Sequence, residues 1–322
     1  MMKRKLLLCA TLWILISPVA FSVTPAAQKT EGAPLPQGEF TAELNRLKLW
    51  YKISGDGPVC LMPSPAWGPS SDLWFRTLKP LEKIFTIVYL DSRGTGRSQH
   101  AKSTKDYTWN DLVADLDALR AHLKQEKVWL MGHSEGGVQI LHYVCKYPDR
   151  ISGLVLLSSL AVNDQKFQGE WQTRALRLKD QPWFAEAMQA LKTDYTLDEQ
   201  LKAGFAKMLP LYWSDPRKID NYQADFAATS WSADAFRGAR DSNRSQYDLT
   251  GQLKRVKAPA LIVAGDNDLL PLATAKTLHL SLPNSKLLVI ENAGHFPWLE
   301  QPDVFFSDVP VFLQALNQAQ KP

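Results

Sequence analysis

The sequence predicts an α/β protein with a mostly parallel sheet, helices on both faces of that sheet, and an inserted helical cap. Short apolar segments alternate with helical patterns over residues 39–161 and again over residues 258–322, with short connections between them. Such alternation is typical of parallel strands joined by helices. Between these two parts, residues 162–257 are polar, rich in tryptophan and helical in pattern, with no apolar strand. We therefore expect one α/β core interrupted by a cap.

Strands are expected where a short apolar or alternating run is bounded by turn residues. The first two runs alternate, and a Gly-Asp-Gly-Pro turn at 55–58 separates them from the rest. The later runs are almost continuously apolar, which is typical of parallel strands covered on both faces. In order, the expected strands span residues 40–44, 47–54, 59–62, 85–90, 128–131, 154–157, 258–264 and 286–290.

Helices are expected between these strands. Thr108-x-x-Asp111 is a capping box, and the apolar residues that follow it fall on one face of a helix. Pro80, which lacks an amide, stands near the end of an earlier helical segment. In order, the expected helices span residues 71–81, 112–123, 138–147, 272–280 and 303–317.

The N-terminal residues lie outside this pattern. Three cationic residues precede an apolar run over 6–21, and small residues follow at its end, as in a secretory signal peptide. We expect residues 1–22 to be cleaved on export, to the periplasm or outside the cell, and residues 23–38 to form a flexible leader. The alternative is an uncleaved membrane anchor, for which the run is short and interrupted by Pro18.

Composition and charge are those of an ordinary globular protein, with 45% hydrophobic and 22% charged residues. Removing residues 1–22 removes three cations and no acid, which lowers the formal charge from +4 to +1 and leaves no basic cluster suited to nucleic acid. Cys60 and Cys145 are expected to be buried free thiols, although an exported protein can also form a disulfide. No His/Cys cluster has metal spacing, so no metal is expected. The expected partner is a small-molecule or short-peptide substrate, with no stable membrane anchor after cleavage.

The central motif is a serine between two glycines at a strand-to-helix junction. The apolar run at 128–131 leads into Gly132-x-Ser134-x-Gly136, and helical spacing resumes over 138–147. A sharp, strained turn of this kind lifts the serine hydroxyl out of the sheet beside the start of a helix, where negative charge is stabilised. We interpret Ser134 as a nucleophile.

A serine hydroxyl needs a base to take its proton and an acid to orient that base. His295 is the candidate base, because it follows the last expected strand in a loop. His133 adjoins the nucleophile, but we expect its side chain to face the opposite way. Asp268, just beyond a strand end, is preferred as the acid over Asp266, which is expected to satisfy local amides, and over Asp164. The chain order Ser-Asp-His is that of one class of serine hydrolases.

These residues carry a resemblance to a known family. The chain resembles the α/β-hydrolase fold superfamily over residues 39–161 and 258–317, and is most similar to its proline iminopeptidase-like branch. The resemblance implies an eight-stranded sheet, a helical cap over the site and no cofactor. We expect the acid and the arginine of its first motif to order a turn rather than to act in catalysis. The matching motifs are Asp91-x-Arg93-Gly94-x-Gly96-x-Ser98, the serine turn, Gly265-x-x-Asp268 and Gly294-His295.

The chain departs from that branch in two places. The branch usually carries His-Gly-Gly-Pro-Gly after the third strand, whereas this chain has Pro-Ser-Pro-Ala-Trp-Gly over 63–68. Pro65 has no N–H, so the resemblance assigns the oxyanion-hole amide to Ala66, with Trp67 as the alternative, and the second donor to the amide of Glu135. The branch also has tryptophan where this chain has Glu135, and its glutamate motif for binding a free amine has no match in the cap.

The sequence therefore predicts an exported serine hydrolase that cleaves an ester or amide bond of a small substrate through an acyl-enzyme. Proline iminopeptidase and carboxylesterase activities are balanced, carbon–carbon bond hydrolysis by the same triad is an alternative, and a non-catalytic binding protein is another. Trp67, Trp171 and Trp183 are expected to contact an apolar part of the substrate. The alternative is that the cap tryptophans form the cap's own small core.

Overall fold

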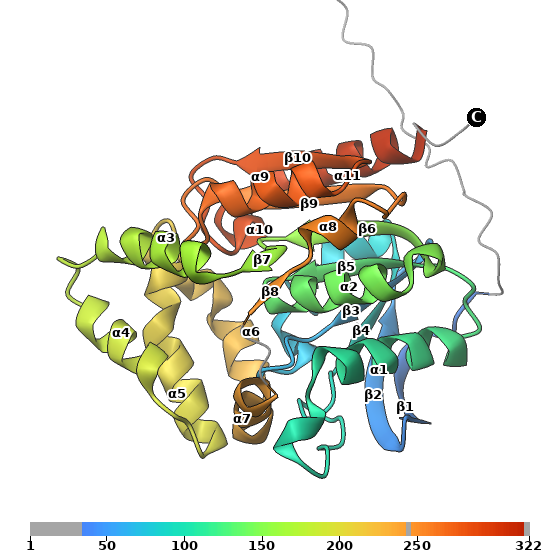
Figure 1. Ribbon diagram of the computed structural model, residues 1–322, viewed down its shortest axis with the longest axis horizontal. Helices are drawn as coiled ribbons and strands as arrows, with labels where there is room; N and C mark the ends of the chain where they lie inside the picture. The colour runs from blue at the N-terminus through green and yellow to red at the C-terminus, as the bar shows by residue number, and fades with distance from the viewer. Residues whose placement is uncertain (1–33, 243–245, 319–322) are drawn as a thin grey trace, which may run out of the picture.

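The computed structural model describes residues 34–242 and 246–318 (Figure 1). The expected signal peptide, residues 1–22, and most of the expected leader, residues 23–38, lie outside the described residues. The first strand begins at Gly38.

The core is an eight-stranded sheet in the order β1-β2-β4-β3-β5-β6-β9-β10. The second strand runs antiparallel to both of its neighbours, and all other neighbouring pairs are parallel. The carboxyl ends of the parallel strands therefore meet at one edge, where the segments after β5, β6, β9 and β10 emerge. The strands are β1 (Gly38–Leu44), β2 (Leu47–Ser54), β3 (Val59–Pro63), β4 (Thr86–Leu90), β5 (Val128–His133), β6 (Ile151–Leu157), β9 (Ala260–Gly265) and β10 (Ser285–Ile290).

Helices cover both faces of this sheet, as expected. Alternate side chains of one strand enter two different cores: Cys60 and Met62 of β3 pack on one face, and Leu61 packs on the other. The Leu61 face is covered by α1 (Trp109–His122), α2 (Glu135–Lys146), α8 (Thr250–Leu253) and α9 (Leu272–Ser281). The opposite face is covered by α11 (Pro302–Gln318), the short α10 (Pro297–Glu300) and residues 73–85.

Two helix predictions had different outcomes. The capping box is present at the start of α1, where Thr108 and Asp111 bond each other's backbone amides at 3.0 and 3.2 Å. The continuous helix expected over 71–81 was wrong: two short 3-10 turns, η1 (Ser71–Leu73) and η2 (Lys79–Lys83), occupy that region. Pro80 removes an amide and its ring excludes an α-helical turn before it.

The cap extends from the carboxyl edge of the sheet, to the left of the core in Figure 1. Two short strands that the sequence pattern missed, β7 (Val162–Asn163) and β8 (Tyr247–Asp248), pair antiparallel where the chain leaves and re-enters the core. Helix α8, within the range expected for the cap, packs against α2 and α9 of the core. The cap elements are α3 (Gln165–Leu176), α4 (Phe184–Lys192), α5 (Asp198–Met208), η5 (Leu209–Tyr212), η6 (Pro216–Tyr222), α6 (Gln223–Ala228) and α7 (Ala233–Asp241).

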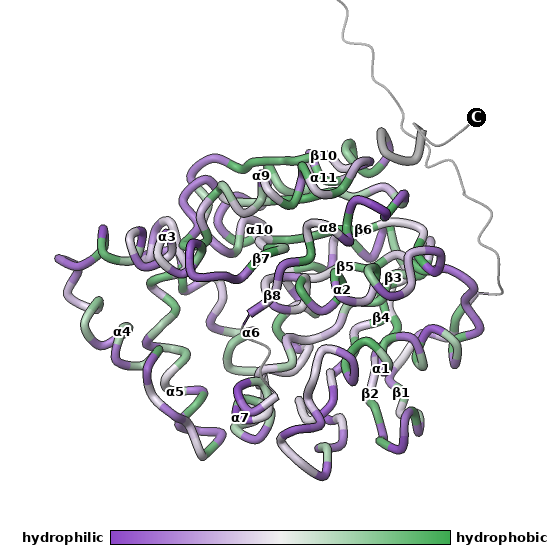
Figure 2. The backbone as a smooth tube through the Cα atoms, in the orientation of Figure 1, coloured by the Kyte–Doolittle hydropathy of each residue, from purple (hydrophilic) through white to green (hydrophobic). Residues whose placement is uncertain are grey.

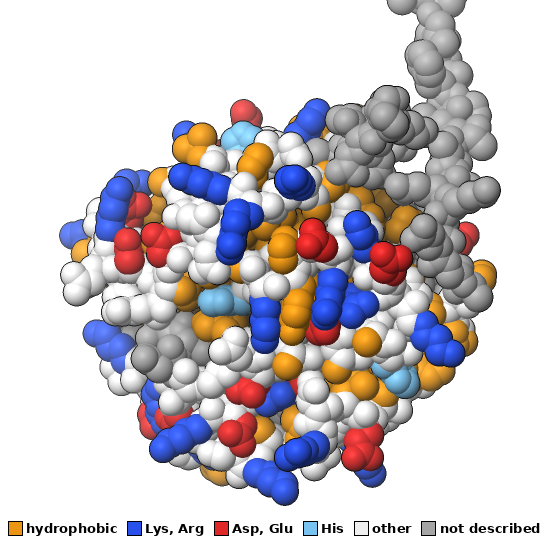
Figure 3. All heavy atoms as spheres, turned by 45° about the vertical axis from the view of Figure 1, so that its right-hand side comes forward, with side chains coloured by type: hydrophobic (Ala, Val, Ile, Leu, Met, Phe, Trp, Pro, Cys, Tyr) orange, Lys and Arg blue, Asp and Glu red, His pale blue; other side chains and the backbone are white. Residues whose placement is uncertain are grey.

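Apolar residues concentrate in the sheet, whereas the outer cap helices mix polar and apolar positions (Figure 2). On the face seen in Figure 3, cationic and anionic side chains are interspersed. Across residues 34–242 and 246–318, no helix is both long and apolar enough to cross a bilayer.

Candidate active site

Ser134 occupies a sharp turn between β5 and α2. Its backbone has φ 52° and ψ −122°, a region that a residue with a Cβ rarely adopts and that stores strain. A Cβ on Gly132 would lie 2.6 Å from the Gly136 carbonyl oxygen, so the turn is too tight for a side chain before the serine, as the motif predicts. After the serine, a Cβ on Gly136 would lie 3.1 Å from the Pro63 carbonyl oxygen, and the closer approach is at Gly137, outside the motif, where a Cβ would lie 2.4 Å from the Ser159 hydroxyl.

Two hydrogen bonds anchor the turn, and Ser134 itself is half-buried. The Ser134 amide donates to the Leu157 carbonyl at 2.9 Å, and the Ser159 hydroxyl donates to the Ser134 carbonyl at 3.0 Å. Glu135 is the first residue of α2, so its amide lies at the helix N-terminus.

The structure brings His295 and Asp268 together. The His295 Nδ1 lies 3.0 and 3.1 Å from the two Asp268 carboxylate oxygens, and both residues are almost fully buried. Asp266 instead accepts from the Ala293 amide at 3.3 Å, which is 27 residues away and not one of the local amides expected. Asp164 caps α3 through the Phe167 amide at 2.8 Å. Of the three carboxylates considered, Asp268 is the one bonded to the imidazole.

His133 does not face away from the site as expected. Its ring lies 4.6 Å from the His295 ring, and its Nε2 lies 3.0 Å from the His295 carbonyl oxygen. The side chain is buried, and burial together with the neighbouring imidazole holds the pKa of His133 well below its ordinary value. The neutral imidazole of His133 therefore packs against the His295 loop. Because His133 directly precedes Ser134, it links that loop to the serine turn.

The His295 loop lies between two other chain segments. A Cβ on Gly265, at the end of β9, would be 2.2 Å from the Ala293 carbonyl, and one on Gly294 would be 2.5 Å from the Tyr212 carbonyl. The same carbonyl of Tyr212, a cap residue, accepts from the His295 amide at 2.7 Å, and the Tyr212 ring lies 5.1 Å from the imidazole. Close backbone approach on both sides explains the glycines of the two downstream motifs.

Two charged contacts of the cap with these loops were missed by the sequence patterns. Arg174 of α3 donates to the Asp268 carbonyl at 2.6 Å. Glu300 of α10 accepts from amides of both the His295 loop and the cap. Both involve backbone groups, which leave no signature in the sequence.

The segment expected to supply the first oxyanion donor is held by the turn at 91–98. Ser64 accepts from the Ser92 amide at 2.9 Å, and its carbonyl accepts from the Ser92 hydroxyl at 2.7 Å. Within the turn, a Cβ on Gly96 would lie 2.1 Å from an Asp91 carboxylate oxygen. Ala66, two residues beyond Ser64, is buried.

The charged residues of this turn have structural partners. Asp91 is fully buried and accepts from the amide and hydroxyl of Ser71 and from Arg97. Arg93 forms a buried ion pair with Asp115 of α1, with Nε 2.7 Å from a carboxylate oxygen. These contacts agree with the expectation that the turn is ordered by charge.

The three tryptophans expected at the substrate lie in two clusters. Trp67 packs against Phe205 and Trp231 at ring distances of 5.2 and 5.8 Å, next to the core on the Cys60 face of the sheet. Trp171 and Trp183 are partly buried against a small cluster formed by cap residues, including Leu211, together with Leu269 of the α/β core. Their role in substrate binding stays a prediction.

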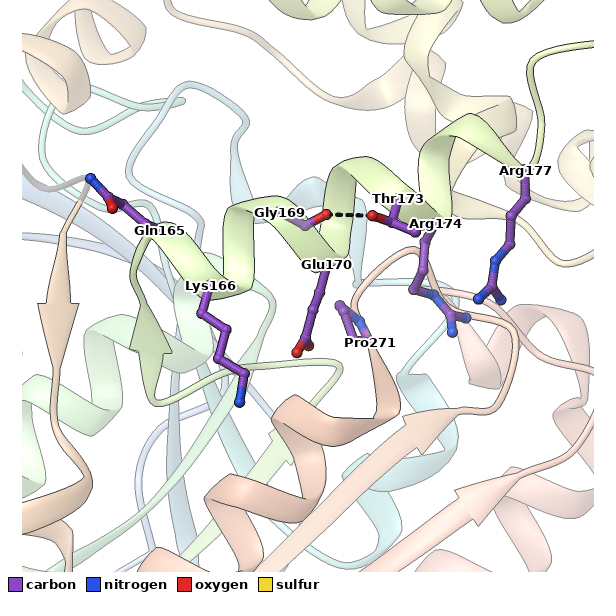
Figure 4. Close-up of a pocket in the computed structure, with 8 residues that line it drawn as sticks. All are labelled: Gln165, Lys166, Gly169, Glu170, Thr173, Arg174, Arg177 and Pro271. Carbon is purple, nitrogen blue, oxygen red and sulfur yellow. Dashed lines mark hydrogen bonds between the residues drawn. The ribbon is translucent and has the colours of Figure 1, made fainter.

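A cavity of about 550 Å³ lies between α3 and Pro271, at the start of α9 (Figure 4). Its lining is mainly charged and polar, and Figure 4 shows Lys166, Glu170 and Arg174 extending from α3 on the side of Pro271. Neither Ser134 nor His295 lines it.

Cys60 and Cys145 are both free thiols. Burial raises the pKa of each, to about 11 for Cys145. In the described part of the chain, no three His, Cys, Asp or Glu side chains are grouped so as to hold a metal ion.

The comparisons with known proteins agree with this architecture. Residues 62–302 match the family described as alpha/beta hydrolase fold. The chain is 28% identical to the proline iminopeptidase PfmaB of Pestalotiopsis fici, over 84% of this chain and 98% of the relative. An alpha/beta fold family hydrolase of Bacillus anthracis superposes with a TM-score of 0.72 at 21% identity, over 85% of this chain and 98% of that one. A thermophilic esterase of Thermogutta terrifontis superposes with a TM-score of 0.64 at 22% identity, over 86% and 98%. The chain belongs to the α/β-hydrolase fold family and is a distant homologue of proline iminopeptidases and other α/β hydrolases.

Proposed function

We propose that this hydrolase is a serine enzyme that works through an acyl intermediate, with Ser134, His295 and Asp268 as its catalytic triad. The observation that carries the proposal is the buried bond between His295 and Asp268, held by His133 against the strained turn that presents Ser134. The order of the three residues in the chain is that of α/β-hydrolases.

In this mechanism His295 takes the proton of the Ser134 hydroxyl as the oxygen attacks the substrate carbonyl. Asp268, bonded to Nδ1, fixes the tautomer that leaves Nε2 as the base and stabilises the imidazolium that forms. The amides of Ala66 and Glu135 are the proposed donors to the tetrahedral oxyanion, and each such donor contributes about 3 kcal/mol. His295 then protonates the leaving group, and water releases the acyl group by the reverse sequence.

The proposed substrate is a small ester or a short amide with an apolar group. Aromatic side chains support this choice, because Tyr212 packs on the imidazole and Trp67 packs with Phe205 and Trp231. Iminopeptidase activity is favoured by the homology, whereas Glu135 in place of tryptophan after the nucleophile favours an ester. Turnover of proline arylamides and of short-chain aryl esters should be compared, with Ser134→Ala as the matched control. Cleavage of esters alone would exclude the aminopeptidase.

A serine-directed fluorophosphonate separates an enzyme from a binding protein on the same fold. We expect the folded protein to be labelled at Ser134 and Ser134→Ala to remain unlabelled. An unreactive Ser134 in folded protein would contradict the catalytic proposal.

We also propose that the protein is exported, on the basis of the leader pattern in residues 1–22. N-terminal sequencing of protein recovered outside the cytoplasm should then begin near residue 23. A chain that starts at Met1 in that fraction would indicate an uncleaved anchor instead.

A further inference from the structure

Glu300 is a buried carboxylate that joins the cap to the His295 loop. One of its oxygens accepts from the Gly294 amide at 2.6 Å. The other accepts from the Ser214 amide at 2.8 Å and the Asp215 amide at 3.3 Å. The residue is only 2% exposed. Its side chain therefore fastens a cap segment and the loop before His295 to a single group.

Other bonds place the same two segments in register. The Tyr212 carbonyl accepts from the His295 amide at 2.7 Å, and Lys218 Nζ donates to the Glu300 carbonyl at 2.8 Å. We call residues 212–215 the cap strap. The strap, the His295 loop and the end of β9 are stacked so closely that glycine is needed at 265 and 294.

The charged groups around Glu300 do not neutralise it fully. Lys218 is the cation that acts on it, and Asp215 is already paired with Arg217. On the loop side, His295 is bonded to Asp268. The buried His133 packs against Trp298 of α10, the helix that also carries Glu300, and its pKa is held well below the ordinary value. Burial outweighs the three amides and Lys218 and raises the pKa of Glu300 to about 7.

We propose that Glu300 is a positioning residue: its two carboxyl oxygens hold the cap strap on the His295 loop and thereby keep the imidazole aligned between Asp268 and Ser134. This inference rests on the triad proposed above.

The three partners of Glu300 are all backbone N–H donors, so both terminal atoms of its side chain must act as hydrogen-bond acceptors. Glutamine has the same shape, but its amide nitrogen is a donor and must face either Gly294 or the strap. Glu300→Gln therefore removes the hydrogen bond to either the Gly294 amide or the cap strap, while the size and packing of the side chain are preserved.

The first experiment measures hydrolysis of an aryl ester by the full protein and by Glu300→Gln. We expect kcat to fall about ten- to a hundredfold with KM little changed, because a displaced base affects the chemical step more than binding. Asp225→Asn is the matched control, since Asp225 is a buried cap carboxylate paired with Arg76, and it should retain the parent's kcat and KM.

The second experiment uses hydrogen exchange and does not depend on turnover. Peptides covering 212–215 and 293–296 should exchange about tenfold faster in Glu300→Gln than in the parent at the same pH. Unchanged exchange in the variant, or a variant with the parent's kcat, would overturn the proposal. A parent that is neither active nor labelled by fluorophosphonate, yet shows the exchange effect, would instead refute the proposed function alone.

Discussion

Replacing Glu300 by glutamine should change how the stability of the protein depends on pH. Burial raises the pKa of this carboxyl from 4.5 to about 7 in the folded state. Between those two values the folded protein binds more protons at this site than the unfolded chain, so its contribution to stability is full below pH 4.5 and is lost as the pH rises to 7.

The size of the effect follows from the shift. A difference of about 2.5 pKa units corresponds to at most about 3 kcal/mol. The parent should thus lose up to about 3 kcal/mol relative to Glu300→Gln between pH 4.5 and 7.5, and the difference should be constant above that range. The buried His133 titrates in the opposite sense, but it is common to both proteins and cancels in the comparison.

Urea unfolding followed by tryptophan fluorescence at pH 4.5, 6 and 7.5 measures this difference, since the chain has 11 tryptophans. Asp225→Asn again serves as the control and should shift stability by a similar amount at each pH. A difference between parent and Glu300→Gln that is independent of pH, or a parent that loses stability relative to the variant as the pH falls, would refute the assignment of a raised pKa to Glu300. The result would also matter for function, because it tests whether an ionised group is kept beside the active site at a cost in stability.

Three further substitutions test the site itself. Ser134→Gly should abolish fluorophosphonate labelling and raise the unfolding free energy by about 1–2 kcal/mol, because glycine tolerates the backbone angles of the turn; an unchanged or lower melting temperature would argue against strain there. Asp268→Asn should lower kcat by about 10³- to 10⁴-fold in an otherwise folded protein, because the imidazole loses its preferred tautomer; steady-state kinetics with matched circular dichroism would check this, and retained activity would exclude Asp268 as the acid. Gly294→Ala should lower both kcat and the melting temperature, because the new Cβ would lie 2.5 Å from the Tyr212 carbonyl; wild-type values for both would show that the strap yields easily.

The sheet was predictable because its strands are buried on both faces. Runs such as Val128–Met131 and the apolar segment at 258–264 leave no alternation to interpret, and their short length with helical segments between them indicates parallel strands. The observed β5 and β9 overlap those ranges. The resemblance implied the number of strands, whereas their order in space is seen only in the structure.

The helix expected over 71–81 shows where pattern reasoning failed. Apolar spacing there favoured an α-helix, but tertiary contacts decide the backbone: Asp91 captures the amide and the hydroxyl of Ser71, and Pro80 interrupts the far end. A buried carboxylate twenty residues away cannot be inferred from local spacing.

The triad candidates and Glu300 differ in how clearly a sequence pattern indicates them. Ser134, Asp268 and His295 are side chains at strand ends with flanking glycines, so their positions in the chain carry a pattern. Glu300 lies in Pro-Trp-Leu-Glu, which has no such pattern, and its partners are backbone amides, one of them 86 residues away. Backbone donors are the same in every residue type except proline, so the contacts of Glu300 were not predictable without the structure.

The stacking of the strap on the His295 loop also limits how the cap can move. Lifting residues 212–215 would break the bonds from Ser214 and Asp215 to Glu300 and the bond from His295 to Tyr212, and would leave a buried carboxylate without most of its donors. Helix α5 is also attached near the site, because the ring of its Phe205 lies 5.2 Å from that of Trp67, whereas α4 packs mainly on α5 and on η5. A cap movement that admits substrate while preserving the catalytic geometry must therefore leave the strap in place, and α4 is the helix with the weakest attachment to it.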